Sequence, residues 1–233
     1  MIDVETLVDH VRTYNTTANV DLICRAYAYG KQKHANQKRH SGESYFTHPI
    51  EVAIILAGQK LDDDTIVTAL LHDTLEDTDA TFKEVTELFG LEIAQLIDGV
   101  TKLTNLELSS VQAKQAENFR KLLLAMSQDL RVLLVKLGDR LHNMRTIKHM
   151  RPEKQISKAR ETMDIFAPLA GRMGMQWMRD ELEDWAFKVL NPEARNSILR
   201  RFINLRDQSE DLIPSIIKDI RTLLSANSIQ ASI

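Results

Sequence analysis

Residues 69–78 read Ala-Leu-Leu-His-Asp-Thr-Leu-Glu-Asp-Thr, which places a histidine and an aspartate side by side at the end of an apolar helical segment. Such a pair is a poor solution for a hydrophobic core, because a buried polar group costs free energy unless a partner compensates it. A metal ion bound by His72 and Asp73 would supply that compensation. The alternative interpretation is the solvated, acidic end of an ordinary helix.

Helical spacing adds two more carboxylates to the same flank. Glu76 lies four residues after His72, and Asp77 lies four residues after Asp73, so each pair shares a helix face. Three carboxylates this close repel one another unless a cation compensates them or one stays protonated. Residues 66–71 are mostly apolar and are expected to be buried, which favours the metal site over the solvated helix end.

Two further candidate ligands lie elsewhere in the chain. Asp139 interrupts a largely apolar helical segment, and Asn143 and Thr146 follow it at i+4 and i+7 on one flank. His48 precedes Pro49, and proline suits the first turn of a helix but disfavours helical backbone in the residue before it. We therefore expect His48 in an extended conformation just outside a helix. On its own it would be an ordinary turn residue.

Glycine is an unexpected neighbour for Asp139. Gly138 costs the helix about 1 kcal/mol relative to alanine, so we expect another backbone or a ligand to approach closely there.

Two histidines and two aspartates form a mixed nitrogen and oxygen ligand set. It suits Mn²⁺, Fe²⁺, Co²⁺ or Zn²⁺ and disfavours Ca²⁺ and Mg²⁺. Coordination positions left open would take water and substrate, and Glu76 and Asp77 could then transfer protons or orient the water. Basic residues before His48, together with Arg140 and Arg145, could bind a phosphorylated substrate, although an ordinary solvated face is equally consistent.

Composition predicts an all-α fold. The 233 residues include 8 glycines, 5 prolines and 6% aromatic residues, and no alternating strand pattern is evident. The net charge of −3 argues against a general nucleic-acid binder, and no apolar run approaches the roughly 20 residues of a membrane span. A single cysteine, Cys24, and the lack of a signal peptide at the N-terminus favour a reducing, cytoplasmic setting.

Helical periodicity and capping residues predict the order of the elements. A loop over 38–47 should separate two helices, and Pro168 should bend the helix that begins at Pro152. We expect a core domain over 1–175 and a helical extension over 176–233, packed on the core or leading out of it. The expected helices are 19–37, 49–58, 62–77, 81–90, 91–103, 112–127, 129–149, one from 152, and helical segments over 175–225.

Several ordered motifs together resemble the hydrolase domain of the RelA/SpoT-homologue family, within the HD-type metal phosphohydrolases. A His-Asp pair alone is weak support, whereas an ordered set at similar spacing is strong. The resemblance covers nearly all of the chain from about residue 20. Its motifs are 39–43 (Arg-His-Ser-Gly-Glu), 46–50 (Phe-Thr-His-Pro-Ile), 69–78, 99–103 (Gly-Val-Thr-Lys-Leu), 116–121 (Ala-Glu-Asn-Phe-Arg-Lys), 139–146 (Asp-Arg-Leu-His-Asn-Met-Arg-Thr) and 161–170 (Glu-Thr-Met-Asp-Ile-Phe-Ala-Pro-Leu-Ala).

The resemblance implies an HD-domain helical bundle and a guanosine-3′,5′-bis(diphosphate) 3′-pyrophosphohydrolase. Such an enzyme removes the 3′-pyrophosphate of the alarmone (p)ppGpp, the signal of the stringent response, to give GDP or GTP. The implied cofactor is one Mn²⁺ held by His48, His72, Asp73 and Asp139. Glu76 and Asp77 match the catalytic acidic pair, and the matches to nucleotide-contacting positions are Arg39 (against guanine), His40, Ser41, Asn143 and Thr146.

Three departures in sequence and three alternatives accompany this resemblance. His40 stands where many relatives have lysine, Gly138 replaces the usual alanine, and residues 170–174 (Ala-Gly-Arg-Met-Gly) match only in part. No synthetase site is recognisable, so association with a separate synthetase or regulatory chain is one expectation. The alternatives are an HD phosphohydrolase acting on another nucleotide such as NADPH or a deoxynucleotide, an alarmone-binding regulatory module without turnover, and a helical scaffold without a ligand.

Overall fold

A computed structural model of the chain describes residues 3–39, 41–105, 129–208 and 212–229. This part of the chain is helical and contains no strand, with Lys38 and Ser44 making an isolated antiparallel bridge, so the all-α prediction is confirmed. The first seven helices are α1 (Val4–Arg12), α2 (Val20–Lys33), α3 (Thr47–Ala57), α4 (Asp63–Leu71), α5 (Thr74–Asp77), α6 (Phe82–Phe89) and α7 (Leu91–Asn105).

The chain then continues with α9 (Leu130–Arg145), a 3₁₀ turn η1 (Ile147–His149), α10 (Pro152–Glu161), a π-helical turn η2 (Thr162–Phe166), α11 (Ala167–Arg172), α12 (Gln176–Leu190), α13 (Pro192–Gln208) and α14 (Leu212–Ala226). The helix expected over 112–127, and the motif over 116–121, lie outside the described residues. None of the described helices combines the length and the apolar character that a membrane crossing requires.

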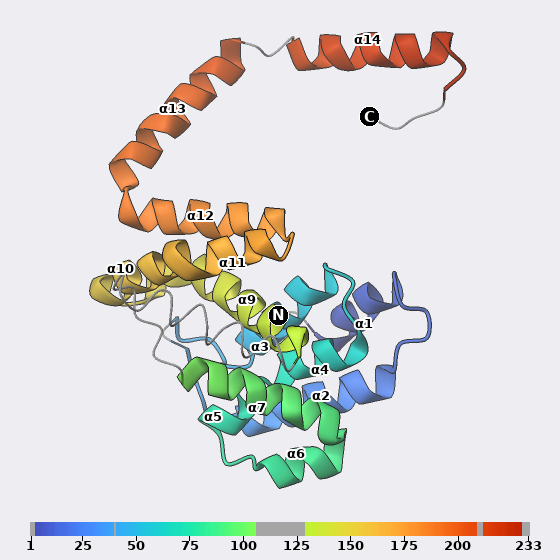
Figure 1. The fold of residues 1–233 in the computed structure, drawn as a ribbon, viewed down its shortest axis with the longest axis vertical. Coiled ribbons are helices and arrows are strands. Elements are labelled where there is room, and N and C mark those ends of the chain that lie inside the picture. Colours follow the sequence, from blue (N-terminus) through green and yellow to red (C-terminus); the bar gives the residue numbers. More distant parts are fainter. Residues whose placement is uncertain (1–2, 40, 106–128, 209–211, 230–233) are drawn as a thin grey trace. The chain divides into compact units, whose positions relative to one another are not determined.

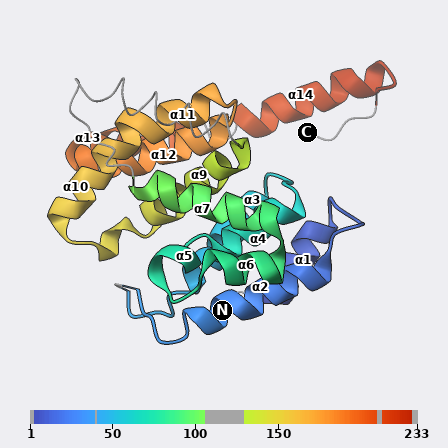
Figure 2. The same ribbon diagram turned by 60° about the horizontal axis from the view of Figure 1, so that its bottom comes forward.

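Helix α3 forms the centre of the core. It packs against α4 and α9, while α2 and α7 cover α4 (Figures 1 and 2). Its mean hydropathy is high, and most of its residues are buried, so the helix is apolar on nearly all sides. The segments that carry the candidate ligands are therefore held by the best-packed part of the fold.

Two predicted helix boundaries near these ligands are wrong. Helix α3 begins at Thr47, so His48 is helical rather than extended; Pro49 still falls in the first turn, where its missing N–H is not needed. The helix capped by Asp62 ends at Leu71 instead of continuing to Asp77, and a turn at His72 and Asp73 precedes α5. The chain thus bends at the His-Asp pair itself.

The helix that begins at Pro152 changes its hydrogen-bonding pattern just before Pro168, the residue at which the sequence predicts a bend. A π-helical turn over Thr162–Phe166 separates α10 from α11, which carries Pro168 in its first turn. The chain divides into two compact units, Met1–Leu190 and Asn191–Ile233. Helix α12 lies in the first unit because Met178, Leu182 and Ala186 are fully buried in it, so this division falls after the boundary expected near residue 175.

Candidate metal centre and active site

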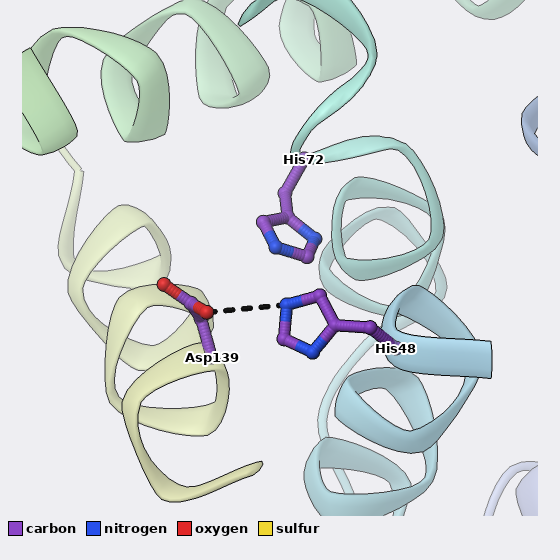
Figure 3. A group of neighbouring side chains, drawn as sticks. All are labelled: His48, His72 and Asp139. Carbon is purple, nitrogen blue, oxygen red and sulfur yellow. Dashed lines mark ion pairs between the residues drawn. The ribbon is translucent and has the colours of Figure 1, made fainter. Parts of the chain in front are cut away.

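Three segments bring the candidate ligands together inside the first unit. His48 lies in the first turn of α3, His72 and Asp73 follow α4, and Asp139 lies in α9. His48, His72 and Asp139 are buried, and one ligand atom from each lies within 4.8 Å of the other two (Figure 3). Nε2 of His48 is 3.2 Å from Oδ1 of Asp139, and Asp73 approaches His72 Nε2 to 3.1 Å. All four predicted ligands therefore converge.

The hydrogen bonds of His72 fit a bound cation. Its Nδ1 donates to the carbonyl of Ala69 at 2.8 Å, so in the neutral ring Nε2 carries a lone pair. That Nε2 is buried, has no hydrogen-bond partner and faces a carboxylate oxygen of Asp73. Two electron-rich atoms this close repel each other unless a cation lies between them. The donor set of imidazole nitrogen and carboxylate oxygen thus suits a divalent metal ion.

The charges around the carboxylates keep them ionised. Burial alone would raise the pKa of Asp139, but Lys136 and His48 outweigh it and hold this pKa well below its ordinary value. Burial likewise opposes ionisation of Asp73, but the positive charge that His72 and His48 carry when protonated holds the pKa of Asp73 below its ordinary range, and a bound cation would replace that charge. Burial lowers the pKa of His48, which favours the neutral ring that binds metals.

The two acidic residues after the His-Asp pair border the same site. Glu76 and Asp77 line a cavity of about 220 Å³ together with His48, Asp73 and Asp139. Burial raises the pKa of Glu76, and the neighbouring Asp77 and Asp73 raise it further. Other residues that line the cavity are Arg39, Tyr45, Lys136, Arg140, Asn143, Met144, Ile147, Met150 and Lys158.

The expected nucleotide contacts are only partly assembled. Arg39 donates from NH2 to Oδ1 of Asn143 at 2.8 Å, and both residues line the cavity. Ser41 instead donates to Glu43, and the Thr146 hydroxyl donates to the carbonyl of His142 at the end of α9. Neither Ser41 nor Thr146 is among the lining residues. The expected contact of His40 lies outside the described residues.

Sequence reasoning missed three side chains that contact the candidate ligands. Tyr45 donates its hydroxyl toward Asp73 and Asp77, and Lys136 donates to Asp139 at 2.6 Å. His142 lies 2.6 Å from His48, measured between their Nδ1 atoms. Lys136 and His142 are three residues before and after Asp139, a helical spacing that could have indicated them. Tyr45 has the same spacing from His48, but in the turn that leads into α3.

Comparisons with known proteins identify relatives of this chain. A family model described as "HD domain" matches residues 26–176. A "GTP pyrophosphokinase rsh" from Brucella ovis is 53% identical over 227 residues, covering 97% of this chain and 30% of the relative. The "Guanosine-3′,5′-bis(diphosphate) 3′-pyrophosphohydrolase" of Aquifex aeolicus is 45% identical over 233 residues, covering 99% of this chain and 32% of that protein. The "Bifunctional (p)ppGpp synthase/hydrolase SpoT" of Escherichia coli is 43% identical over 216 residues, covering 93% of this chain and 31% of SpoT.

A solved structure also matches. It is a metazoan orthologue of SpoT, described as hydrolysing ppGpp and playing a role in starvation responses. The TM-score is 0.52 at 25% identity, and the match covers 74% of this chain and 95% of the other. The chain spans about a third of the length of the curated relatives, at 30–32%, whereas it covers nearly all of this metazoan protein.

Proposed function

Because the chain belongs to the HD-domain family and the relatives that it matches are RelA/SpoT-type proteins, we propose that it hydrolyses the alarmone (p)ppGpp. The reaction would remove the 3′-pyrophosphate and leave GDP or GTP, in the cytoplasm as part of the stringent response. The observation that carries the proposal is the convergence of His48, His72, Asp73 and Asp139 beside a cavity that Glu76 and Asp77 also line.

The proposed cofactor is one Mn²⁺ held by His48, His72, Asp73 and Asp139. Imidazole nitrogens with carboxylate oxygens suit this ion better than Ca²⁺ or Mg²⁺, which prefer oxygen ligands. When bound, the ion supplies a Lewis acid that lowers the pKa of a coordinated water and offsets negative charge on the phosphate.

We assign the proton transfers to Glu76 and the orientation of the attacking water to Asp77. The oxygen of water attacks the phosphorus attached to O3′, and the bond between that phosphorus and O3′ breaks. The raised pKa of Glu76 suits a group that accepts the proton of the attacking water and then gives it to the departing O3′. Asp77, beside it and within reach of the Tyr45 hydroxyl, would orient the water.

Positive side chains at the same cavity would hold the phosphates. Lys136, Arg140 and Lys158 line it, and they would stabilise the negative charge of the pyrophosphoryl group as it is transferred from O3′ to water. Arg39 is proposed to stack on the guanine base, with Asn143 beside it. Assignments of His40, Ser41 and Thr146 to the nucleotide rest on the motifs alone.

The direct test is turnover of ppGpp by the purified protein with Mn²⁺, with GDP and pyrophosphate quantified. Asp73→Asn should abolish turnover while leaving the circular dichroism spectrum unchanged. Asp98→Asn is the matched control, because Asp98 pairs with the exposed Lys102 on α7 and does not line the cavity beside the candidate ligands. Binding of ppGpp without turnover by the wild type would instead support a regulatory module, and faster turnover of NADPH or a deoxynucleotide would reassign the substrate.

A further inference from the structure

His142 lies between the candidate guanine-binding residue and a candidate metal ligand. Its Nδ1 is 3.2 Å from NH1 of Arg39 and 2.6 Å from Nδ1 of His48. His142 is buried in the last turns of α9, three residues after Asp139. One nitrogen atom of this ring therefore contacts both partners.

Hydrogen-bonding rules settle the direction of both contacts. A guanidinium group donates and cannot accept, so Nδ1 of His142 accepts from Arg39 and carries no proton. The second contact joins two ring nitrogens and needs one proton between them, which must then belong to Nδ1 of His48. In a neutral ring, this leaves the lone pair of His48 on Nε2.

That lone pair points into the metal centre. Nε2 of His48 is 3.2 Å from Oδ1 of Asp139, and an unprotonated nitrogen cannot donate to that carboxylate. The arrangement is favourable when a cation lies between the two atoms. The acceptor on His142 thus selects the tautomer of His48 that a metal ion requires.

A second path joins the same residues on the other side. Asn143 accepts from Arg39 at 2.8 Å and donates from Nδ2 to Oδ1 of Asp139. Arg39, His142, His48, Asp139 and Asn143 therefore form a closed ring of polar contacts. Two of its members are candidate metal ligands, and Arg39 reaches the ring from the loop between α2 and α3.

We propose that His142 is a positioning residue that fixes the tautomer and orientation of His48 for metal binding, and that links the Arg39 loop to the metal centre. This inference rests on the metal site of the proposed function, but not on the identity of the nucleotide. A side chain that fills the same space without an acceptor would leave the His48 tautomer unselected.

The test compares two substitutions of His142 by Mn²⁺ titration calorimetry, without any nucleotide. Asparagine can place its Oδ1 where Nδ1 of histidine lies, so His142→Asn keeps the acceptor, whereas His142→Leu keeps bulk and removes it. We expect His142→Leu to weaken Mn²⁺ binding by about ten- to a hundredfold, the usual loss for an outer-shell partner of a ligating histidine. His142→Asn should bind within a fewfold of the wild type.

The link to Arg39 is tested by a double-mutant cycle on the same affinity. Arg39→Met should weaken Mn²⁺ binding more in the wild-type background than in His142→Leu, because the second protein has already lost the shared acceptor. If the loss of Mn²⁺ affinity in the double variant equals the product of the losses in the two single variants, the link to Arg39 is overturned.

The outcomes separate this inference from the proposed function. Equal Mn²⁺ affinity of the wild type and a folded His142→Leu would overturn the role of His142, and so would a His142→Asn protein that is folded but binds as weakly as a ligand variant. If His142→Leu does not fold, the affinity of His142→Asn decides the question. A wild type that binds no Mn²⁺ would instead remove the metal site on which both proposals rest.

Discussion

The hydroxyl of Tyr45 lies 2.6 Å from Oδ2 of Asp77. The same oxygen is 2.9 Å from Oδ2 of Asp73, so a phenol with one proton faces two carboxylates. Burial raises the pKa of Tyr45, and the charges of Asp73 and Asp77 raise it further, which keeps the proton on the phenol. Tyr45 thus joins a candidate metal ligand to a member of the acidic pair.

Tyr45→Phe should weaken the metal site and slow the reaction. Without the hydroxyl, Asp73 loses the donor that orients it, and its repulsion with Asp77 is no longer offset. We expect the Mn²⁺ affinity to fall about tenfold, at the lower end of outer-shell effects, and the kcat for ppGpp to fall at least as much. Calorimetric titration and steady-state kinetics measure the two effects.

Tyr14→Phe is the matched control for this substitution. Tyr14 also donates its hydroxyl, at 2.9 Å, but its partner is the carbonyl of Leu61, before α4, and not a candidate metal ligand. Its loss should lower stability by about 0.5–1.5 kcal/mol, as for an ordinary hydrogen bond, without changing Mn²⁺ affinity. Equal affinities of Tyr45→Phe and Tyr14→Phe would show that the Tyr45 hydroxyl has no part in the site.

Metal binding should also stabilise the fold. Ligands from α3, α9 and the turn after α4 are tied together by one ion, and an ion that binds only the folded state adds about 2.7 kcal/mol at a hundredfold excess over its Kd. We expect Mn²⁺ to raise the Tm by about 5–10 °C, and a chelator to reverse the shift. His72→Ala should melt at the same temperature with and without the ion.

The control for that experiment is His149→Ala, since His149 is exposed in the 3₁₀ turn η1. His149→Ala should show the same rise in Tm on addition of Mn²⁺ as the wild type. A shift of the same size in His72→Ala would mean that the ion acts elsewhere on the protein.

The sequence was enough to predict that the ligands converge, but not the backbone that holds them. The spacing of His72, Asp73, Glu76 and Asp77 indicated one polar flank on a continuous helix, whereas the chain turns at the His-Asp pair before α5. Local propensity does not reveal such a turn, because His72 and Asp73 both keep near-helical backbone angles.

Long-range contacts explain what else was missed. Gly138 was expected to mark a close backbone or ligand, and its neighbours are instead the side chains of Leu56 and Val52 on α3. The link from His142 to His48 crosses 94 positions in the sequence, so no local pattern could indicate it. Candidate metal ligands and catalytic residues can be recognised in a sequence, while the side chains that orient them depend on the fold.

Low pH should break one ion pair between α9 and α12. Arg145 donates from Nε and NH2 to the two oxygens of Glu181, at 2.6 and 2.7 Å, and these hydrogen bonds lower the pKa of Glu181. A carboxyl whose pKa is lower in the folded state contributes stability above its unfolded pKa of about 4.5, and that stability is lost as the pH falls through the folded value.

Glu181→Gln should therefore be less stable than the wild type at pH 7 and approach it in acid. The glutamine keeps an acceptor for Trp185, which donates to Oε1 of Glu181, so the change removes chiefly the charge. We expect a loss of about 0.5–1 kcal/mol at pH 7, since the pair is partly exposed. Urea unfolding between pH 7 and pH 3 measures the difference. A difference that stays constant down to pH 3 would contradict the assignment, and the exposed Glu87→Gln should show little effect throughout.

Gly30→Ala should destabilise the protein although alanine is the better helix former. A Cβ at Gly30 would lie 2.6 Å from Cε2 of Phe46 and 3.0 Å from the carbonyl oxygen of Leu70, and that backbone oxygen belongs to α4, next to the metal centre. Overpacking of this kind costs about 1–3 kcal/mol, more than the ~1 kcal/mol gained in helix propensity.

Gly138→Ala is the matched control. Its Cβ would lie 3.2–3.3 Å from the side chains of Leu56 and Val52. Because these side chains can shift, the stability of Gly138→Ala should stay near that of the wild type. Urea unfolding ranks the three proteins, and a Gly30→Ala variant at least as stable as Gly138→Ala would show that α2 can move away from α4 without loss.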